Sequence, residues 1–263
     1  MNIISKTLQN PSSPCSLIPF ITAGYPTLQT TVDILYTLDS KGADIIELGI
    51  PYSDALADGP TIQDASKAAI KQGVHLDQIL YLLKKVTPEI TTPIVIFTYY
   101  NPILAVGTMS FISKISKSGV KGLVIPDLPL EEVDYVSQLC SSFKIELILF
   151  IAPTSSKSRI ISILAKSPGC IYLVSSNGVT GMGQQVDKQI GNLVKFIKNR
   201  TDKSIMLGFG IASTDQAYNV SQLNIDGIVV GSAFIRQISK SDNIALDVGV
   251  FCEKLKLAIS SKL

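Results

Sequence analysis

The stretch IIELGIPYSDALADGP, residues 45–60, contains the pattern on which the fold depends. It begins with aliphatic residues interrupted by one carboxylate, Glu47, and a continuous apolar run is typical of a parallel strand covered on both faces. It then turns through glycine and proline into a loop that carries Asp54 and Asp58 and leads to a helical pattern. We therefore interpret the stretch as one strand–loop–helix unit with an acid near the end of the strand.

The same unit recurs along the whole chain. Further apolar runs resemble the first and alternate with helical patterns. The expected strands fall at 16–24, 43–51, 92–100, 121–129, 145–153, 169–176, 204–211 and 226–234, and the expected helices at 28–38, 62–70, 76–86, 109–115, 131–139, 158–164, 190–197 and 214–220. About eight such units in 263 residues predict an α/β fold, a (β/α)8 TIM barrel with extra helices. We expect a single domain over residues 1–263.

An open, doubly wound sheet is the alternative fold. It is disfavoured because the first expected strand is followed by ITAGYP, without the G-x-G-x-x-G pattern that binds dinucleotides.

Composition excludes several classes of function. The formal net charge is +2 and arginine is scarce, so the basic stripe that nucleic-acid binding needs is absent. The four cysteines lie far apart in the sequence, which predicts reduced packing thiols rather than a zinc site or disulfides. No apolar run approaches the ~20 residues that cross a membrane, and the N-terminus lacks the apolar segment of a signal peptide. We expect a cytoplasmic protein, or one of the plastid stroma if the gene is carried by an organelle.

Glycine-rich loops follow the last three expected strands: SSNGVTGMG at 175–183, LGFGIAS at 207–213 and VVGSAF at 229–234. In such barrels the active site lies at the carboxyl ends of the strands, and the loops after the last two strands often bind phosphate. Glycine lets the backbone approach a ligand, and free N–H groups at a helix start bind anions. We expect Ser232 to begin the short helix of a phosphate site, where several charge-assisted hydrogen bonds can hold a phosphate without any arginine.

The two kinds of acid call for different interpretations. Glu47 is flanked by aliphatic residues, and burial would raise its pKa and fit it for proton transfer near neutral pH. Asp58 could equally be a turn residue or the N-cap of the following helix. No lysine stands at a strand's carboxyl end for Schiff-base chemistry, and the only histidine, His75, lies between two expected helices. Carboxylate acid–base chemistry on a phosphorylated substrate remains.

The segment ELGIPYSDALADGPTIQ, residues 47–63, closely resembles the signature of the tryptophan synthase alpha subunit family. The resemblance continues, in the family's order, through PFITAGYP, PIVIFTYYNPI, GLVIPDLPLEE, YLVSSNGVTGMG, GFGIAS and DGIVVGSAF. It covers essentially the whole chain. Other barrel families share the phosphate loops but not the acidic segment.

This resemblance implies a carbon–carbon lyase that cleaves indole-3-glycerol phosphate into indole and D-glyceraldehyde 3-phosphate in L-tryptophan biosynthesis. Glu47 corresponds to the acid–base that protonates the indole C3, and Asp58 to the carboxylate that faces the indole N–H. The residues expected around the indole ring are Phe20, Tyr99, Tyr172 and Phe209. Those expected at the phosphate are Gly181, Gly210, Gly231 and Ser232. Thr180 corresponds to a residue that helps to close the site and orient Asp58.

The resemblance also implies a partner, a beta subunit that carries pyridoxal phosphate and receives indole through a tunnel in an alpha2-beta2 tetramer. It implies no cofactor and no metal in this chain, and it places contacts with the partner in the loops after the second and sixth strands. Two departures from the family pattern affect these loops. Ala55 replaces the usual proline, which should give its loop more freedom before it orders. Ser176 and Asn177 stand where other members often have arginine or another residue.

Two other functions stay open. A barrel isomerase acting on another sugar phosphate would need a base and an electrophile, and would leave the aromatic residues Phe20, Tyr99 and Phe209 without a purpose. A non-catalytic barrel, retained as an allosteric subunit, is disfavoured by the presence of both Glu47 and Asp58.

Overall fold

A computed structural model of the chain describes residues 2–10, 13–174, 184–208 and 210–260. Eight parallel strands close into a barrel in chain order, so the predicted (β/α)8 fold is confirmed. The strands are β1 (Ser16–Thr22), β2 (Ile46–Gly49), β3 (Ile94–Phe97), β4 (Gly122–Val124), β5 (Glu146–Ile151), β6 (Ile171–Val174), β7 (Ile205–Gly208) and β8 (Gly227–Val230). Nearly all of their residues are buried, because barrel side chains fill the interior on one face and pack under helices on the other.

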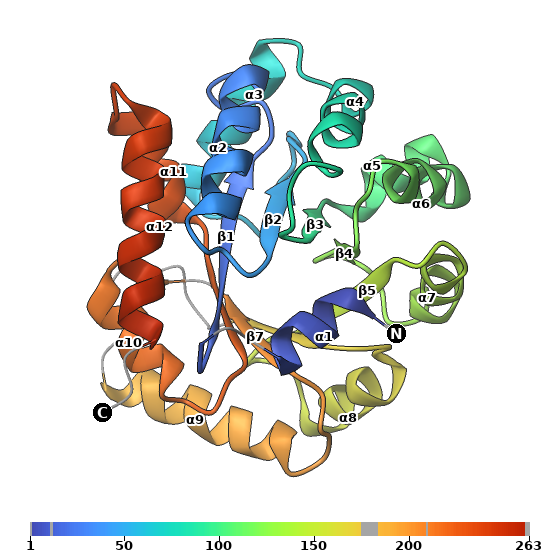
Figure 1. The fold of residues 1–263 in the computed structure, drawn as a ribbon. Coiled ribbons are helices and arrows are strands. Elements are labelled where there is room, and N and C mark those ends of the chain that lie inside the picture. The colour runs from blue at the N-terminus through green and yellow to red at the C-terminus, as the bar shows by residue number, and fades with distance from the viewer. Residues whose placement is uncertain (1, 11–12, 175–183, 209, 261–263) are drawn as a thin grey trace.

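Helices surround the barrel (Figure 1). They are α1 (Ile3–Gln9), α2 (Leu28–Ser40), α3 (Pro60–Lys71), α4 (Leu76–Val86), α5 (Tyr100–Val106), α6 (Thr108–Lys117), α7 (Val133–Ser142), α8 (Lys157–Lys166), α9 (Gln184–Lys198), α10 (Thr214–Ser221), α11 (Ser232–Lys240) and α12 (Ile244–Ser260). Each of the eight expected helices is present. The gap between β2 and β3 holds α3 and α4, as the spacing predicts.

The strands end earlier than the sequence predicts, at the carboxyl ends where the loops begin. Apolar residues continue past the last hydrogen-bonded pair, so each expected strand was too long. Tyr100, expected at the end of the third strand, instead begins α5, where its backbone N–H donates to Asp127 Oδ1 at 2.8 Å. The helices α1, α5 and α12 were not expected, and they supply the extra turns around and beneath the barrel.

Helix α1 closes the amino-terminal end of the barrel. Its Ile4 and Leu8 are fully buried, and they lie against the glycines that begin β4 and β8. The carboxylate of Glu146, at the start of β5, accepts hydrogen bonds from the backbone N–H (3.0 Å) and the hydroxyl of Ser5. A short helix thus forms the floor of the barrel, and the opposite end carries the candidate site.

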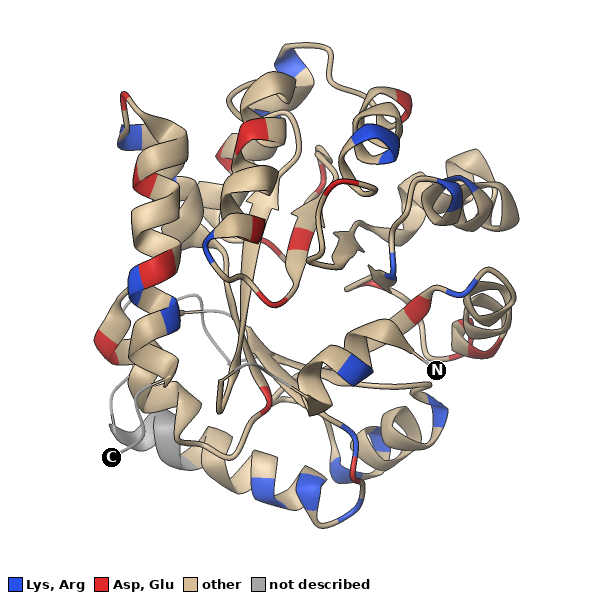
Figure 2. Ribbon diagram, in the orientation of Figure 1, with Lys and Arg blue, Asp and Glu red and all other residues tan. Residues whose placement is uncertain are grey.

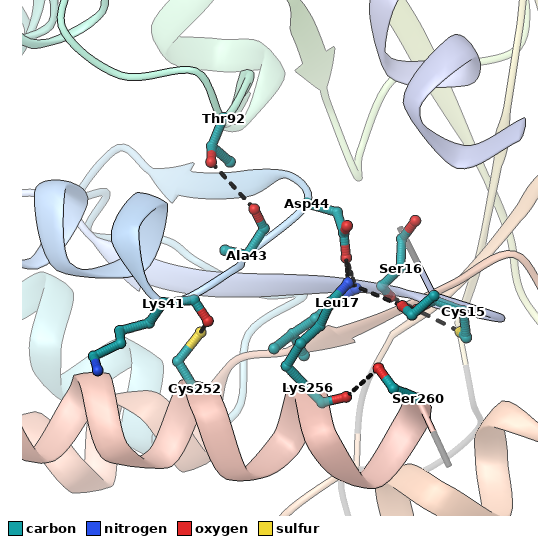
Figure 3. A network of polar contacts seen from close by, with 11 residues as sticks. Cys15, Ser16, Leu17, Lys41, Ala43, Asp44, Thr92, Cys252, Lys256 and Ser260 are labelled. Carbon is teal, nitrogen blue, oxygen red and sulfur yellow. Dashed lines mark hydrogen bonds and ion pairs between the residues drawn. The ribbon is translucent and has the colours of Figure 1, made fainter. Parts of the chain in front are cut away.

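The last helix, α12, is attached to the same amino-terminal side (Figure 3). Asp44, just before β2, accepts from the backbone N–H of Leu17 at 2.7 Å and forms an ion pair with Lys256 of α12. The two charged side chains are 7% and 16% exposed, respectively. Lys256 also donates to Ser13 Oγ at 2.9 Å. This network joins the chain's last helix to its first two strands.

The distribution of charge on the surface and the state of the four cysteines match the expectations from the composition. Both signs of charge are distributed around the ring of helices (Figure 2). All four cysteines are free and buried, and burial raises the pKa of Cys15 and Cys140 to about 12, so they are packing residues rather than reactive thiols. Within the described ranges no helix has the length and apolar character of a membrane span.

Candidate active site

A cavity of about 330 Å³ opens at the carboxyl ends of the strands. Its lining comes from loops and strand ends on both sides of the barrel axis. The lining residues are Phe20, Glu47, Ala57, Asp58, Gly59, Pro60, Thr61, Ile62, Phe97, Tyr172, Gly210, Ile211, Ala212, Val229, Gly231, Ser232 and Arg236. The cavity therefore brings the two predicted acids together with the predicted phosphate loops.

Glu47 is held deep in this cavity by β2, whose register pairs it with Phe20 of β1 and Val95 of β3. Its side chain is buried, with 2% of the residue exposed. The Tyr172 hydroxyl donates to Glu47 Oε2 at 3.5 Å, which is a weak contact. Glu47 Oε1 has no hydrogen-bond partner among the described residues. A buried, unpartnered carboxyl oxygen is costly to a folded protein, and here it belongs to a residue that lines a ligand-sized cavity.

Asp58 lies in the loop between β2 and α3 and is half-buried. The N-cap residue of α3 is Gly59, so the alternative role of Asp58 as a helix cap is wrong. Its carboxylate instead accepts a hydrogen bond from the Tyr99 hydroxyl at 2.8 Å. The loop itself is held by Gln63, whose Nε2 donates to the carbonyls of Ala55 (3.1 Å) and Asp58 (2.9 Å).

The surroundings of the two acids separate their ionisation. Burial, and then the negative charge of Asp58, raise the pKa of Glu47 to about 8. Burial raises the pKa of Asp58 to about 6, against the hydrogen bond from Tyr99, which lowers it. At neutral pH Glu47 is therefore mainly a proton donor and Asp58 mainly an anion. Two carboxyl groups with separated pKa values in one cavity are typical of an acid–base site.

Aromatic rings form one wall of the site. Phe20 and Phe97 meet edge to face with ring centres 5.7 Å apart, and Phe150 stacks on Tyr172 at 4.4 Å. Glycine makes room for two of these rings. A Cβ atom on Gly208 would lie 2.4 Å from the Tyr172 ring, and one on Gly49 would lie 2.6 Å from that of Phe20. This apolar, aromatic wall suits an aromatic substrate.

Another part of the cavity lining suits an anion. Gly210, Gly231 and Ser232 all line it, as predicted, and Ser232 begins α11, so the free N–H groups of this helix are available there. Arg236, one helical turn after Ser232, lines the same cavity. Among the described lining residues it is the only lysine or arginine. No role in the site was predicted for Arg236 from the sequence.

The remaining predicted residues are distributed as follows. Phe20 and Tyr172 line the cavity, whereas Tyr99 lies behind Phe97 and touches the site through its hydroxyl. Thr180, Gly181 and Phe209, together with the departures Ser176 and Asn177, lie outside the described residues. Asp54 is exposed and accepts from the Ser53 hydroxyl at 2.8 Å, consistent with a role in loop structure.

Sequence reasoning missed Phe97, Phe150 and Arg236. Phe97 and Tyr99 share an alternation at the end of the third strand, and Arg236 follows Ser232 at helical spacing; these signals were present but weak. In the described part of the chain no cluster of histidine, cysteine and acidic side chains could hold a metal ion.

Known proteins resemble this chain over nearly its whole length. The profile of the family described as tryptophan synthase alpha chain matches residues 7–259. The tryptophan synthase alpha chain of Gracilaria tenuistipitata var. liui is 57% identical over 261 residues, which cover 98% of this chain and 97% of that one. Among solved structures, tryptophan synthase of Mycobacterium tuberculosis has a TM-score of 0.90 at 28% identity, covering 99% of both chains. The tryptophan synthase complex of Pyrococcus furiosus has a TM-score of 0.84 at 31% identity, covering 93% and 98%.

Proposed function

Because this chain belongs to the tryptophan synthase alpha chain family, we propose that it cleaves indole-3-glycerol phosphate into indole and D-glyceraldehyde 3-phosphate. The reaction is a retro-aldol cleavage of a carbon–carbon bond, the alpha reaction in L-tryptophan biosynthesis. The observation that carries the proposal is the pairing of buried Glu47, with one free carboxyl oxygen, and Asp58 in a cavity with an aromatic wall and an anion-binding end.

The substrate's two ends match the two ends of the cavity. The indole ring lies along Phe20, Phe97 and Tyr172, and the phosphate lies at the start of α11 near Ser232 and Arg236. Each charge-assisted hydrogen bond to the phosphate contributes about 1.5–3 kcal/mol, so a few of them fix the substrate's position. The bond to be broken then lies between these ends, next to the acids.

Cleavage begins with protonation of the ring. Glu47, protonated at neutral pH, donates its proton to the indole C3, and the positive charge that develops on the ring nitrogen is stabilised by the Asp58 carboxylate. The Glu47 carboxylate then accepts the proton of the glycerol hydroxyl next to C3. The hydroxyl oxygen forms a carbonyl, the carbon–carbon bond breaks, and its electron pair returns to the ring. The proton gained by C3 stays on indole, and Glu47 ends protonated as it began.

The test is an indole-release assay on the purified chain and on the variants Glu47→Gln and Asp58→Asn. Both variants keep the size of the side chain and remove its ionisation. We expect a loss of at least about 100-fold in kcat for Glu47→Gln, since general acid–base catalysis contributes about 10²–10⁴-fold. Near-normal rates in both variants would remove this mechanism. Binding of simple sugar phosphates in preference to indole-bearing phosphates would favour an isomerase instead.

We also propose that the chain functions with a beta subunit that carries pyridoxal phosphate, in an alpha2-beta2 tetramer, and that it needs no cofactor of its own. The description of the Pyrococcus furiosus relative as a complex supports a partner. So does Leu56, an apolar residue of the loop after β2 that is 91% exposed. Turnover measured with and without a beta subunit tests the partnership, and appreciable turnover excludes the non-catalytic alternative. The compartment, cytoplasm or plastid stroma, stays a prediction.

A further inference from the structure

Tyr99 connects two loops of the candidate site through its hydroxyl. It lies between β3 and α5, is buried, and serves as the N-cap residue of α5. The hydroxyl donates to Asp58 Oδ2 at 2.8 Å and accepts from the backbone N–H of Ala57 at 3.1 Å. Both of its hydrogen-bonding capacities are therefore used on consecutive residues of the neighbouring loop.

The carboxylate and the backbone of that loop are held by different side chains. Gln63 holds the backbone through the carbonyls of Ala55 and Asp58, and the N–H of Asp58 donates to Ala55 O at 3.1 Å. Among the described residues, Tyr99 is the only one whose side chain hydrogen-bonds the Asp58 carboxylate. The direction of that carboxylate therefore depends on one hydroxyl group.

We infer that Tyr99 is a positioning residue that orients the Asp58 carboxylate toward the substrate and keeps it ionised. The inference rests on the proposed function for what Asp58 does. It assigns to the Tyr99 hydroxyl a role beyond contact with the indole ring. Tyr99 is not one of the described lining residues, and it contacts that lining through hydrogen bonds to Ala57 and Asp58 and through ring packing against Phe97, with ring centres 6.1 Å apart.

The charges around Asp58 give the hydroxyl an effect on both acids. Titratable groups interact with Asp58 or Tyr99 from several elements: Glu47 (β2), Asp127 (after β4) and Tyr172 (β6). Arg236 (α11) lines the same cavity. The Tyr99 hydrogen bond lowers the pKa of Asp58, and the resulting negative charge raises the pKa of Glu47. Tyr99 thus favours the anion at Asp58 and, through it, the proton at Glu47.

Tyr172 offers an internal comparison. It contacts Glu47 as Tyr99 contacts Asp58, but at 3.5 Å rather than 2.8 Å, and it leaves Glu47 Oε1 unpartnered. The shorter contact is the stronger hydrogen bond, because hydrogen bonds weaken steeply at such distances. The two tyrosines are therefore not equivalent, and the well-formed bond belongs to Asp58.

The test compares Tyr99→Phe with the unaltered chain and with Tyr52→Phe. Tyr52 is a matched control, since its ring packs on Tyr99 at 5.2 Å while its hydroxyl accepts from Asn101 at 3.2 Å and touches neither acid. The Asp58 pKa is measured by carbon NMR titration of the labelled carboxyl group, assigned by comparison with Asp58→Asn. We expect it to rise by about one pH unit in Tyr99→Phe and to stay unchanged in Tyr52→Phe.

Kinetics provide the second readout. In a plot of kcat for indole release against pH, the acidic limb should move to higher pH by about the same amount in Tyr99→Phe. At pH 7 the rise in the Asp58 pKa lowers the ionised fraction of Asp58 about twofold, so kcat should fall at least about twofold while KM stays within about twofold. Hydrogen exchange at the Ala57 amide should accelerate as well. A role in stability alone would lower the unfolding midpoint without moving the acidic limb.

An Asp58 pKa in Tyr99→Phe equal to that of the unaltered chain would overturn the inference, and so would a superimposable pH profile. The NMR titration needs no turnover. A chain that releases no indole would therefore contradict the proposed function, while the effect of Tyr99 on Asp58 would still be measured.

Discussion

Glu47 and Asp58 share one cavity, but their neighbours assign them opposite charge states. Glu47 lies on a central strand among aliphatic side chains, with only the long Tyr172 contact. Asp58 lies on a loop and has a short hydrogen bond from Tyr99. The buried strand position of Glu47 therefore favours its protonated form, and the hydrogen bond to Asp58 favours the ionised form of that residue. These two charge states fit the proposed roles of proton donor and stabilising anion.

The raised pKa of Glu47 makes the stability of the fold depend on pH. In the unfolded chain the group ionises near 4.5, whereas in the fold it ionises near 8. Between these values the fold holds a proton that the unfolded chain has released, so rising pH favours unfolding. Glu47→Gln removes this effect, and its stability advantage over the unaltered chain should grow by a few kcal/mol, on the order of 2–4, from pH 5 to pH 8.

Urea unfolding at the two pH values measures that advantage. The exposed Glu131→Gln variant is the control and should show no such growth. An advantage for Glu47→Gln that is constant with pH would contradict a raised pKa at Glu47.

Single site residues could be predicted from the sequence where their neighbours along the chain reveal their role. An acid among aliphatic residues at a strand's end predicted Glu47, and glycine followed by serine after the last strand predicted Gly231 and Ser232. The hydrogen bond from Tyr99 to Asp58 joins residues 41 positions apart. It depends on how two loops settle beside each other, and residue types do not encode that geometry.

Among the elements, the repeated units were predictable because each combines a continuous apolar strand with a helical pattern. The helices at the two ends of the chain, α1 and α12, were not, since α1 precedes the first strand and α12 is a second helix after β8. Both attach to the amino-terminal side of the barrel through buried acids: α1 to Glu146 and α12 to Asp44. Such attachments are visible only once the strands are closed.

The ion pair between Lys256 and Asp44 should contribute strongly to stability, because it is largely buried. In Lys256→Met the apolar stem is kept, but the ammonium group facing a buried carboxylate is removed. Breaking a buried pair on one side costs about 3–5 kcal/mol, so we expect a loss of roughly 3 kcal/mol in the free energy of unfolding.

The matched control is Lys254→Met, an exposed lysine on the same helix, which should change stability by less than about 0.5 kcal/mol. Denaturant unfolding compares the two variants. Equal stability of both would show that α12 is held by its apolar face rather than by the ion pair.

At the scale of the whole molecule, the closed barrel presents its candidate site and Leu56 on neighbouring surfaces. Leu56 projects from the loop that also carries Asp58, two residues later. A partner that covered this apolar side chain would therefore contact the loop that holds one of the two acids. Binding and the position of Asp58 would be linked through a few residues of chain.

We expect Leu56→Asp to weaken binding of a beta subunit at least tenfold, since it places a charge on an apolar contact. Calorimetry or sedimentation measures the dissociation constant. Ile161→Asp is the control, because it makes a similar change at a residue of α8 that is 50% exposed. Equal weakening by both substitutions, or none by Leu56→Asp, would place the contact elsewhere.

The closure of the barrel's amino-terminal end by α1 also affects where substrate enters and products leave. Side chains fill the interior of the barrel, and Ile4 and Leu8 of α1 cover its amino-terminal end, so the candidate site opens at the carboxyl ends of the strands. Substrate therefore enters at the carboxyl ends of the strands, and both products leave at that same end. If the proposed beta subunit covers that end of the barrel, it would determine whether indole is released to water or passes directly to the partner.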